Sequence, residues 1–267
     1  MKLSLSNIAW NPRDDHEVLS ILRNNNISYI DIAPSLFQDI EENYILSEFL
    51  ELKNFWNIQS IEFNSMQSLL FGLGDFSIFD KTNHKILIDR LKKTFEIAEV
   101  LNIKNLIFGS PKNRNFIQKG KEQNLKIAKE FFCNVSNVMN SFNCVLSIEP
   151  NPKIYGSDFI INTIECIDFI KDMNRKNLKV HIDIGSSKIN NENLENTFNK
   201  NADLINSIHI SEPNLEIIHD KEYHLICSKL IKKYLPNTVL SIEIAEKNIM
   251  NLQELEKNII LIKEIYN

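Results

Sequence analysis

The stretch VLSIEPNP, Val145–Pro152, is a short apolar run that delivers one carboxylate, Glu149, and then stops at prolines. The chain nearly repeats it as VLSIEIAE, Val239–Glu246, where the carboxylate is Glu243. A glutamate inside an apolar strand costs several kcal/mol unless it is paired or bound to a metal. The two stretches therefore indicate buried strands whose ends carry functional carboxylates.

Two further stretches of the same kind lie between them: LKVHIDIGSS, Leu178–Ser187, and SIHISEPN, Ser207–Asn214. Each begins apolar and rich in β-formers, and each delivers a metal-capable side chain near its end. Oxygen ligands with one imidazole suit Mn²⁺, Mg²⁺ or Co²⁺, with Zn²⁺ as an alternative. The sequence therefore predicts one divalent metal ion, Mn²⁺ first among these, on Glu149, Asp183, His209 and Glu243.

Strand-like and helix-like segments alternate along all 267 residues, and the apolar fraction of 43% is enough for a sizeable core. Alternation indicates a parallel sheet, and eight strand–helix units in about 250 residues indicate a closed (β/α)8 TIM barrel. We therefore expect an α/β fold with a single domain spanning residues 1–267. An open doubly wound sheet is the alternative, but no GxGxxG motif follows the first apolar stretch.

The pattern also predicts where these elements lie. The strands are expected at Leu3–Trp10, Ile27–Ala33, Ile58–Phe63, Asn105–Phe108, Cys144–Ile148, Leu178–Ile184, Ser207–Ile210 and Thr238–Ile244. The helices are expected at Asp14–Asn25, Gln38–Phe55, Lys85–Leu101, Glu122–Ser141, Ser157–Met173 with Ser157 as N-cap, within Asn191–Ile205, Lys221–Tyr234 and Leu252–Ile265. The aromatic stripe of the Glu122–Ser141 helix is interpreted as core packing.

In a barrel of this kind the active site lies at the C-terminal ends of the strands. His181 precedes Asp183 by two residues, so it shares a strand face with it and lies one layer deeper, either as a partner of a ligand carboxylate or as a core histidine. Lys112 and Arg114 would either bind an anion, pair with the carboxylates or remain solvated loop charges. The expected substrate-binding residues are Asn7, Gln67, Lys112, Arg114, His181 and Glu212.

Bulk properties narrow the function classes. The net charge is −5 with both signs mixed and no polybasic block, so nucleic-acid binding is not expected. The four cysteines show no CxxC pair and are interpreted as reduced thiols of a cytoplasmic protein. No signal-peptide pattern and no run near the roughly 20 apolar residues of a membrane span is present, so no membrane partner is expected.

The ordered set Glu149, Asp183, His209 and Glu243 resembles that of the xylose-isomerase-like barrels of sugar and sugar-phosphate isomerases and epimerases, which include ketose 3-epimerases and hydroxypyruvate isomerase. The resemblance runs the whole length. The segments SNIAW, SMQSLLFG and FGSPKNR, at 6–10, 65–72 and 108–114, resemble a subgroup associated with polysaccharide biosynthesis. The resemblance also implies a small-molecule sugar or sugar-phosphate partner. Homo-oligomers are common in the family, although no segment here demonstrates one.

The resemblance implies an isomerase, either a sugar epimerase or an aldose–ketose isomerase. A divalent metal would chelate a carbonyl oxygen and an adjacent hydroxyl of the sugar and stabilise an enediolate. Glu149 and Glu243 would be the catalytic acid/base pair, one removing the proton next to the carbonyl and the other returning it.

The chain departs from the epimerase pattern at three positions. Related epimerases have histidine where this chain has Ser186, often arginine where it has Leu215, and often an acidic or polar residue where it has Tyr155. The histidine and arginine help to hold substrate oxygens, so the usual free-ketose specificity is not expected.

Three other functions remain open. The related endonuclease IV barrel, a phosphodiesterase, needs three zinc ions and extra histidines that this chain lacks. A metal-free sugar binder of a glycan pathway would need no exchangeable proton at a substrate carbon. A sugar dehydratase would use the same enediolate to expel a β-hydroxyl, and product analysis separates it from an isomerase.

Overall fold

Eight parallel strands pair in chain order and close on themselves, the first bonding to the last, which confirms the (β/α)8 TIM barrel. The computed structural model describes residues 1–40, 44–117 and 120–267. The strands are β1 Leu3–Ser6, β2 Tyr29–Ile32, β3 Glu62–Met66, β4 Asn105–Phe108, β5 Val145–Ile148, β6 Leu178–Asp183, β7 Ile205–Ile210 and β8 Leu240–Ile242.

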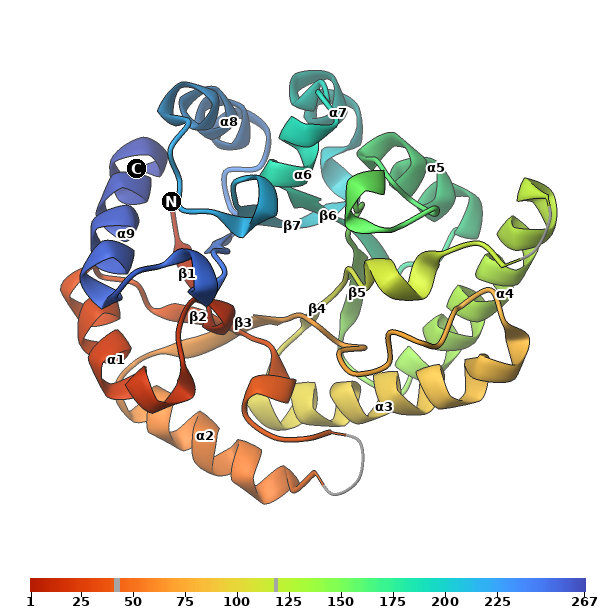
Figure 1. The fold of residues 1–267 in the computed structure, drawn as a ribbon, viewed down its shortest axis with the longest axis horizontal. Helices are drawn as coiled ribbons and strands as arrows, with labels where there is room; N and C mark the ends of the chain where they lie inside the picture. Colours follow the sequence, from red (N-terminus) through yellow and green to blue (C-terminus); the bar gives the residue numbers. More distant parts are fainter. Residues whose placement is uncertain (41–43, 118–119) are drawn as a thin grey trace.

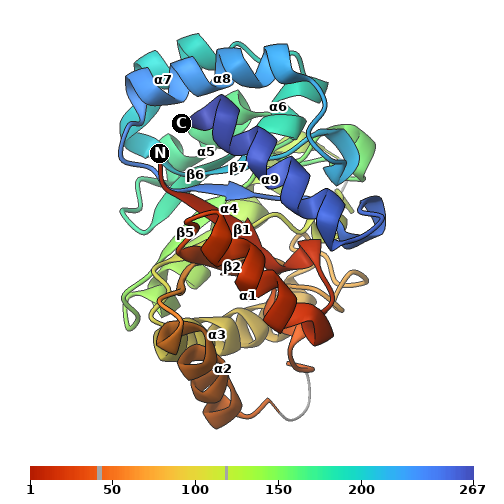
Figure 2. The ribbon, with the colours of Figure 1, turned by 90° about the vertical axis from the view of Figure 1, so that its left-hand side faces the viewer.

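The helices surround the barrel as an outer ring (Figure 1), and the two chain ends lie side by side (Figure 2), where the Met1 amino group donates to Asn267 Oδ1 at 2.7 Å. None of the helices in the described ranges is long and apolar enough to cross a membrane. The helices are α1 Asp15–Asn24, α2 Leu46–Ile58, α3 His84–Leu101, α4 Lys121–Met139, α5 Thr163–Met173, α6 Ile184–Ile189, α7 Leu194–Asn201, α8 Lys221–Tyr234 and α9 Leu252–Tyr266.

The third strand lies further along the chain than the predicted 58–63. Ile58 is the last residue of α2 and is 78% exposed, so its apolar side chain does not start a buried strand. The chain then reverses at Ser60, whose φ is +61°, and pairing begins at Glu62. This shift carries β3 through Ser65 and Met66 and places Gln67 directly at its C-terminal end.

The starts of two helices differ from expectation, and one short helix was not predicted. Helix α5 is capped by Asn162, whose side chain accepts from the Glu165 amide, whereas the Ser157 hydroxyl donates to the Phe159 carbonyl inside the preceding loop. Helix α2 begins at Leu46, and part of the predicted 38–55 helix, residues 41–43, lies outside the described residues. The short helix α6 was not predicted, because its six residues follow β6 without a turn.

Apolar packing and polar packing occupy different places. The aromatic stripe of α4 lies in the core between strands and helices, as predicted: Phe132 stacks edge-on with Phe108 and Phe169, with ring centroids 5.3 and 5.4 Å away. The barrel interior instead contains buried polar side chains. Such groups must be hydrogen-bonded or ligand-bound. A ligand site is therefore expected in the barrel interior or at its C-terminal mouth.

Candidate metal centre

Three of the four predicted metal ligands meet at the C-terminal ends of β6, β7 and β8. Asp183 ends β6 and pairs in register with His209 of β7, and Glu243 follows β8 directly. One donor atom from each of the three lies within 4.8 Å of the others, and all three residues are buried. This spacing lets the three side chains hold one metal ion.

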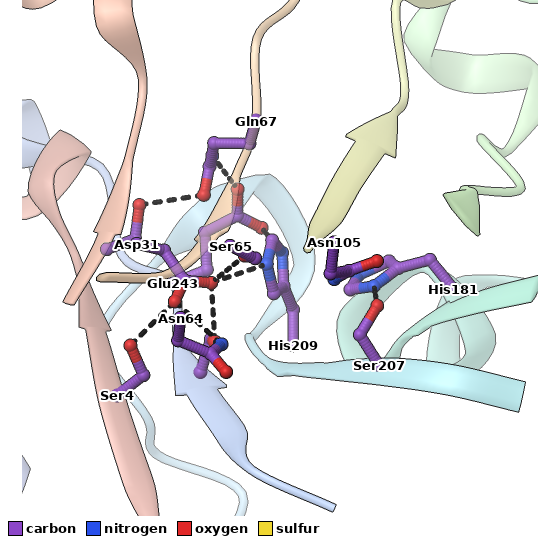
Figure 3. Close-up of polar contacts among 12 residues, drawn as sticks. Ser4, Asp31, Asn64, Ser65, Gln67, Asn105, His181, Ser207, His209 and Glu243 are labelled. Carbon is purple, nitrogen blue, oxygen red and sulfur yellow. Dashed lines mark hydrogen bonds and ion pairs between the residues drawn. The ribbon is translucent and has the colours of Figure 1, made fainter. Parts of the chain in front are cut away.

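The geometry around His209 supports a shared cation better than a hydrogen bond. Its Nδ1 lies 2.9 Å from Glu243 Oε2, as drawn in Figure 3. Yet both ring nitrogens are buried and neither has an aligned hydrogen-bond partner among the described residues. Neighbouring donors on an octahedral ion with bonds of about 2.1 Å stand about 3 Å apart, so the two atoms fit adjacent positions around one ion.

Buried negative charge at this mouth provides the electrostatic reason for a cation. Burial, together with the nearby carboxylates of Glu243 and Asp183, raises the pKa of Glu149 to about 8. Burial and the Glu243 charge also raise the pKa of Asp183. Burial lowers the pKa of His209, but the carboxylates of Glu243 and Asp31 outweigh it and raise that pKa well above its usual value. A divalent ion would relieve this repulsion.

The Asp183 carboxylate is oriented by the unpredicted helix α6. Its Oδ1 accepts from the Ser186 amide at 2.6 Å, so Asp183 is the N-cap of that helix. Its Oδ2 accepts from the Ser211 hydroxyl at 2.5 Å, and Ser211 in turn accepts from the Gly185 amide at 2.9 Å. Residue 185 is glycine because a Cβ there would lie 2.7 Å from the Glu212 backbone.

Glu149 lies at the same mouth but outside the three-residue group. It follows β5, and its amide donates to the Phe108 carbonyl at 3.0 Å. A Cβ at residue 109 would be 2.5 Å from Glu149 Oε2, so the carboxylate occupies the space that Gly109 leaves free. Its role as a fourth metal ligand therefore stays a prediction.

A further carboxylate, that of Asp31, lies beneath the group, and its role was not predicted from the sequence. Asp31 of β2 is fully buried and accepts hydrogen bonds from three serine hydroxyls and one amide, partly visible in Figure 3. Burial opposes its ionisation, but His209 and these donors outweigh burial and lower the pKa of Asp31 to about 2. Its Oδ2 lies 3.7 Å from His209 Nε2. The sequence signal was the single charge in the apolar run ISYIDIA. The donors are Ser4, Asn64, Ser65 and Ser241.

One of the predicted substrate-binding residues, Gln67, contacts a ligand of this centre, and another, Asn7, joins two loops at the same end of the barrel. Gln67 Nε2 donates to Glu243 Oε1 at 2.6 Å, and Gln67 Oε1 accepts from the Ser6 hydroxyl at 2.8 Å. Asn7 Oδ1 accepts from the Ala33 amide at 2.7 Å and so ties the loop after β1 to the loop after β2. Gln67 therefore orients a ligand carboxylate directly, and its contact with substrate remains a prediction.

His181 lies next to His209 with ring centroids 4.2 Å apart. Its Nδ1 is 2.7 Å from the Ser207 hydroxyl, and its Nε2 is buried without a partner in the described chain. Burial and the neighbouring His209 lower its pKa well below the usual value, so the ring is neutral at pH 7. The hydrogen bond goes to a serine and not to a metal-ligand carboxylate.

The other predicted substrate-binding residues have different surroundings. The Glu212 carboxylate accepts from Lys188 at 2.8 Å and from the Asp220 amide at 2.8 Å, so it holds α6 to the start of α8. Arg114 is fully buried and donates to the Glu149 carbonyl at 3.0 Å. Lys112 is exposed, with its stem against Gly74. Substrate contact by these three residues stays a prediction.

Comparisons with known proteins agree on the fold. No family model and no curated protein matches the sequence. The structure matches 3-keto-D-glucoside 4-epimerase YcjR from E. coli at 15% identity, covering 99% of both chains, with a TM-score of 0.78. A xylose isomerase domain protein from Alicyclobacillus acidocaldarius has the same TIM-barrel fold, at 11% identity with a TM-score of 0.68. Several other matching structures are sugar 3-epimerases.

Two further matches show that proteins with this fold include a zinc-bound protein and an endonuclease. The IOLI protein, solved with a bound zinc atom, is 16% identical and matches over 100% of both chains with a TM-score of 0.71. A family 2 AP endonuclease from Brucella melitensis is 12% identical over 96% of both chains, with a TM-score of 0.72. At these identities the likeness establishes the fold, and function must be argued from the site.

Proposed function

We propose that this protein is a divalent-metal-dependent isomerase or epimerase of sugars or sugar phosphates, which works by proton transfer through an enediolate. The observation that carries the proposal is the buried group of Asp183, His209 and Glu243 at the C-terminal mouth of the barrel. Active sites of TIM barrels lie at that end. The segments that resemble a polysaccharide-biosynthesis subgroup support a substrate from glycan metabolism.

The chain's own residues supply the proton transfers. Glu149 takes the proton from the carbon next to the carbonyl, and Glu243 serves the opposite side of the substrate. Burial and the neighbouring carboxylates raise the pKa of Glu149 above its ordinary value, and a raised pKa strengthens a carboxylate as a proton acceptor. Gln67, which donates to Glu243, keeps that carboxylate in place.

A divalent ion, Mn²⁺ first, with Mg²⁺, Co²⁺ or Zn²⁺ as alternatives, would be held by Asp183, His209, Glu243 and Glu149. When bound, such an ion acts as a Lewis acid that stabilises negative charge on the substrate oxygens. His209 and the carboxylates provide the mixed nitrogen and oxygen ligands that these ions accept.

The endonuclease alternative is less well supported by the site. Residues 1–40, 44–117 and 120–267 contain one group with the spacing of metal ligands, whereas a three-zinc phosphodiesterase needs several histidines beyond His209.

Ser186 and Leu215 replace two epimerase residues, so the proposed substrate differs from a free ketose.

Elemental analysis of the purified protein tests the proposal. We expect about one divalent ion per chain in the wild type, none in His209→Ala, and an unchanged content in His16→Ala, whose side chain is exposed. Solvent-deuterium exchange into candidate sugars then tests proton transfer. No metal even with excess Mn²⁺ would remove this chemistry and favour a sugar-binding protein, and three zinc ions per chain would favour the endonuclease.

A further inference from the structure

A cavity opens at the same end of the barrel as the candidate metal centre. It has a volume of about 190 Å³ and is formed by the loops that follow β1, β2, β3 and β8. Most of its wall is apolar. The apolar residues that line it are Ile8, Trp10, Pro12, Ala33, Leu36 and Phe71.

Two chain segments connect the cavity to the Glu243 side of the metal centre. Ser68, which lines it, follows Gln67, and Gln67 donates to Glu243. Glu246, which also lines it, stands three residues after Glu243. Ala33 is hydrogen-bonded through its amide to Asn7, at the end of β1. These short chain connections place the cavity within reach of a substrate held at the metal centre.

We propose that this cavity binds an apolar ring carried by the substrate, so that the substrate is a glycoside or other sugar conjugate and not a free sugar. This inference rests on the proposed function for the sugar part. The size fits, because a cavity of about 150 Å³ lined by apolar side chains is enough to bind benzene. The apolar part of this wall offers no hydrogen-bond partners to the hydroxyls of a sugar, whereas an apolar ring needs none there.

Two observations support ligand binding at this wall. Phe71 is 66% exposed and Leu36 is 43% exposed, so both side chains present apolar surface to water at the mouth of the barrel. The hydroxyl oxygen of Ser35, also in the wall, is shielded from solvent and has no hydrogen-bond partner in the described chain. A ring covering Phe71 and Leu36 would bury apolar area, and a polar atom beside the ring would satisfy Ser35.

Calorimetric titration with matched glycosides tests the proposal. The probes are the phenyl and methyl β-glycosides of glucose and of galactose, each titrated with excess Mn²⁺ and again with EDTA. We expect a phenyl glycoside to bind at least tenfold more tightly than its methyl counterpart. In Phe71→Ala that ratio should fall below about threefold. Ile154→Ala removes a side chain that is 70% exposed in the loop after β5 and should leave the ratio unchanged.

A phenyl-to-methyl ratio near one in the wild type, or an unchanged ratio in Phe71→Ala, overturns the proposal. Because Phe71 is exposed, its loss should not unfold the protein. We call the cavity with its bound ring the ring site. The titrations and the metal analysis distinguish failure of the ring site from failure of the proposed function. One metal ion per chain without a phenyl preference removes the ring site alone. A Phe71-dependent phenyl preference in protein that binds no metal keeps the ring site and removes the proposed reaction.

Discussion

His209 Nδ1 and Glu243 Oε2 lie 2.9 Å apart with no aligned hydrogen bond between them. The two side chains come from neighbouring strands, β7 and the end of β8, so the rigid barrel holds them at this spacing. Two buried donor atoms at this spacing, without an aligned hydrogen bond between them, suit neighbouring positions around one metal ion.

Replacing either proposed acid/base residue should abolish turnover without unfolding the protein. Glu149→Gln and Glu243→Gln keep the size of the side chain and remove the proton acceptor, so we expect each to lower turnover by roughly 10²- to 10⁴-fold. Turnover on a substrate identified by deuterium exchange, with a denaturation curve for each variant, provides the measurement. Glu216→Gln, at an exposed position, is the control. Substantial activity in either variant would exclude the two-carboxylate mechanism.

Gly109→Ala should displace the Glu149 carboxylate. The added Cβ would stand 2.5 Å from Oε2, so the carboxylate must move, and a displacement of about 1 Å can lower the rate about 10²-fold. Gly74→Ala is the matched control, because its Cβ would meet only the flexible Lys112 side chain at 3.2 Å. Equal turnover in the two variants would show that the position of Glu149 does not matter.

Asp31→Asn should weaken both the fold and the metal site. Asparagine has the same shape, but its amide NH₂ would face hydroxyl donors such as Ser65 and Ser241, so we expect a loss of about 1–3 kcal/mol in unfolding free energy. Loss of the charge beside His209 should lower metal affinity about 10- to 100-fold, as for other groups that orient metal ligands. Urea denaturation and metal titration measure the two effects.

The control for Asp31 is Asp75→Asn, at an exposed position, which should change neither quantity. Stability lost with metal affinity unchanged would limit Asp31 to a structural role.

Glu212 should make stability depend on pH. Burial opposes its ionisation, but His224, Lys188 and the backbone amides that it binds outweigh burial, so the pKa of Glu212 is lowered below its ordinary value of 4.5. The unfolded chain therefore takes up this proton first as the pH falls. The stabilisation is fully present above pH 4.5 and is lost as the pH falls towards the folded-state pKa.

The unfolding free energies of wild type and Glu212→Gln should therefore differ most at pH 7 and converge below about pH 4.5. Urea denaturation between pH 3 and pH 7 measures this difference. A gap that stays constant across that range would mean that the Glu212 charge does not contribute.

The sequence by itself determined the barrel, because the alternation of short apolar runs with amphipathic helices is a local pattern. It can be recognised without knowledge of which segments pack together. It also determined that Asp183, His209 and Glu243 belong together, since each ends a strand and parallel strands end on the same side of a barrel. Tertiary structure decided what local patterns do not contain. The start of β3 depended on the reversal at Ser60.

The surroundings of each charged side chain also depended on the tertiary structure. Asp31 lies 3.7 Å from His209 Nε2 and accepts hydrogen bonds from hydroxyl groups that β1, β3 and β8 place around it. Glu212 resembled a mouth residue by its position after β7, but its carboxylate faces Lys188 and the start of α8. Position along a strand is encoded locally, whereas the partner of a buried charge is set by whichever distant segment packs against it.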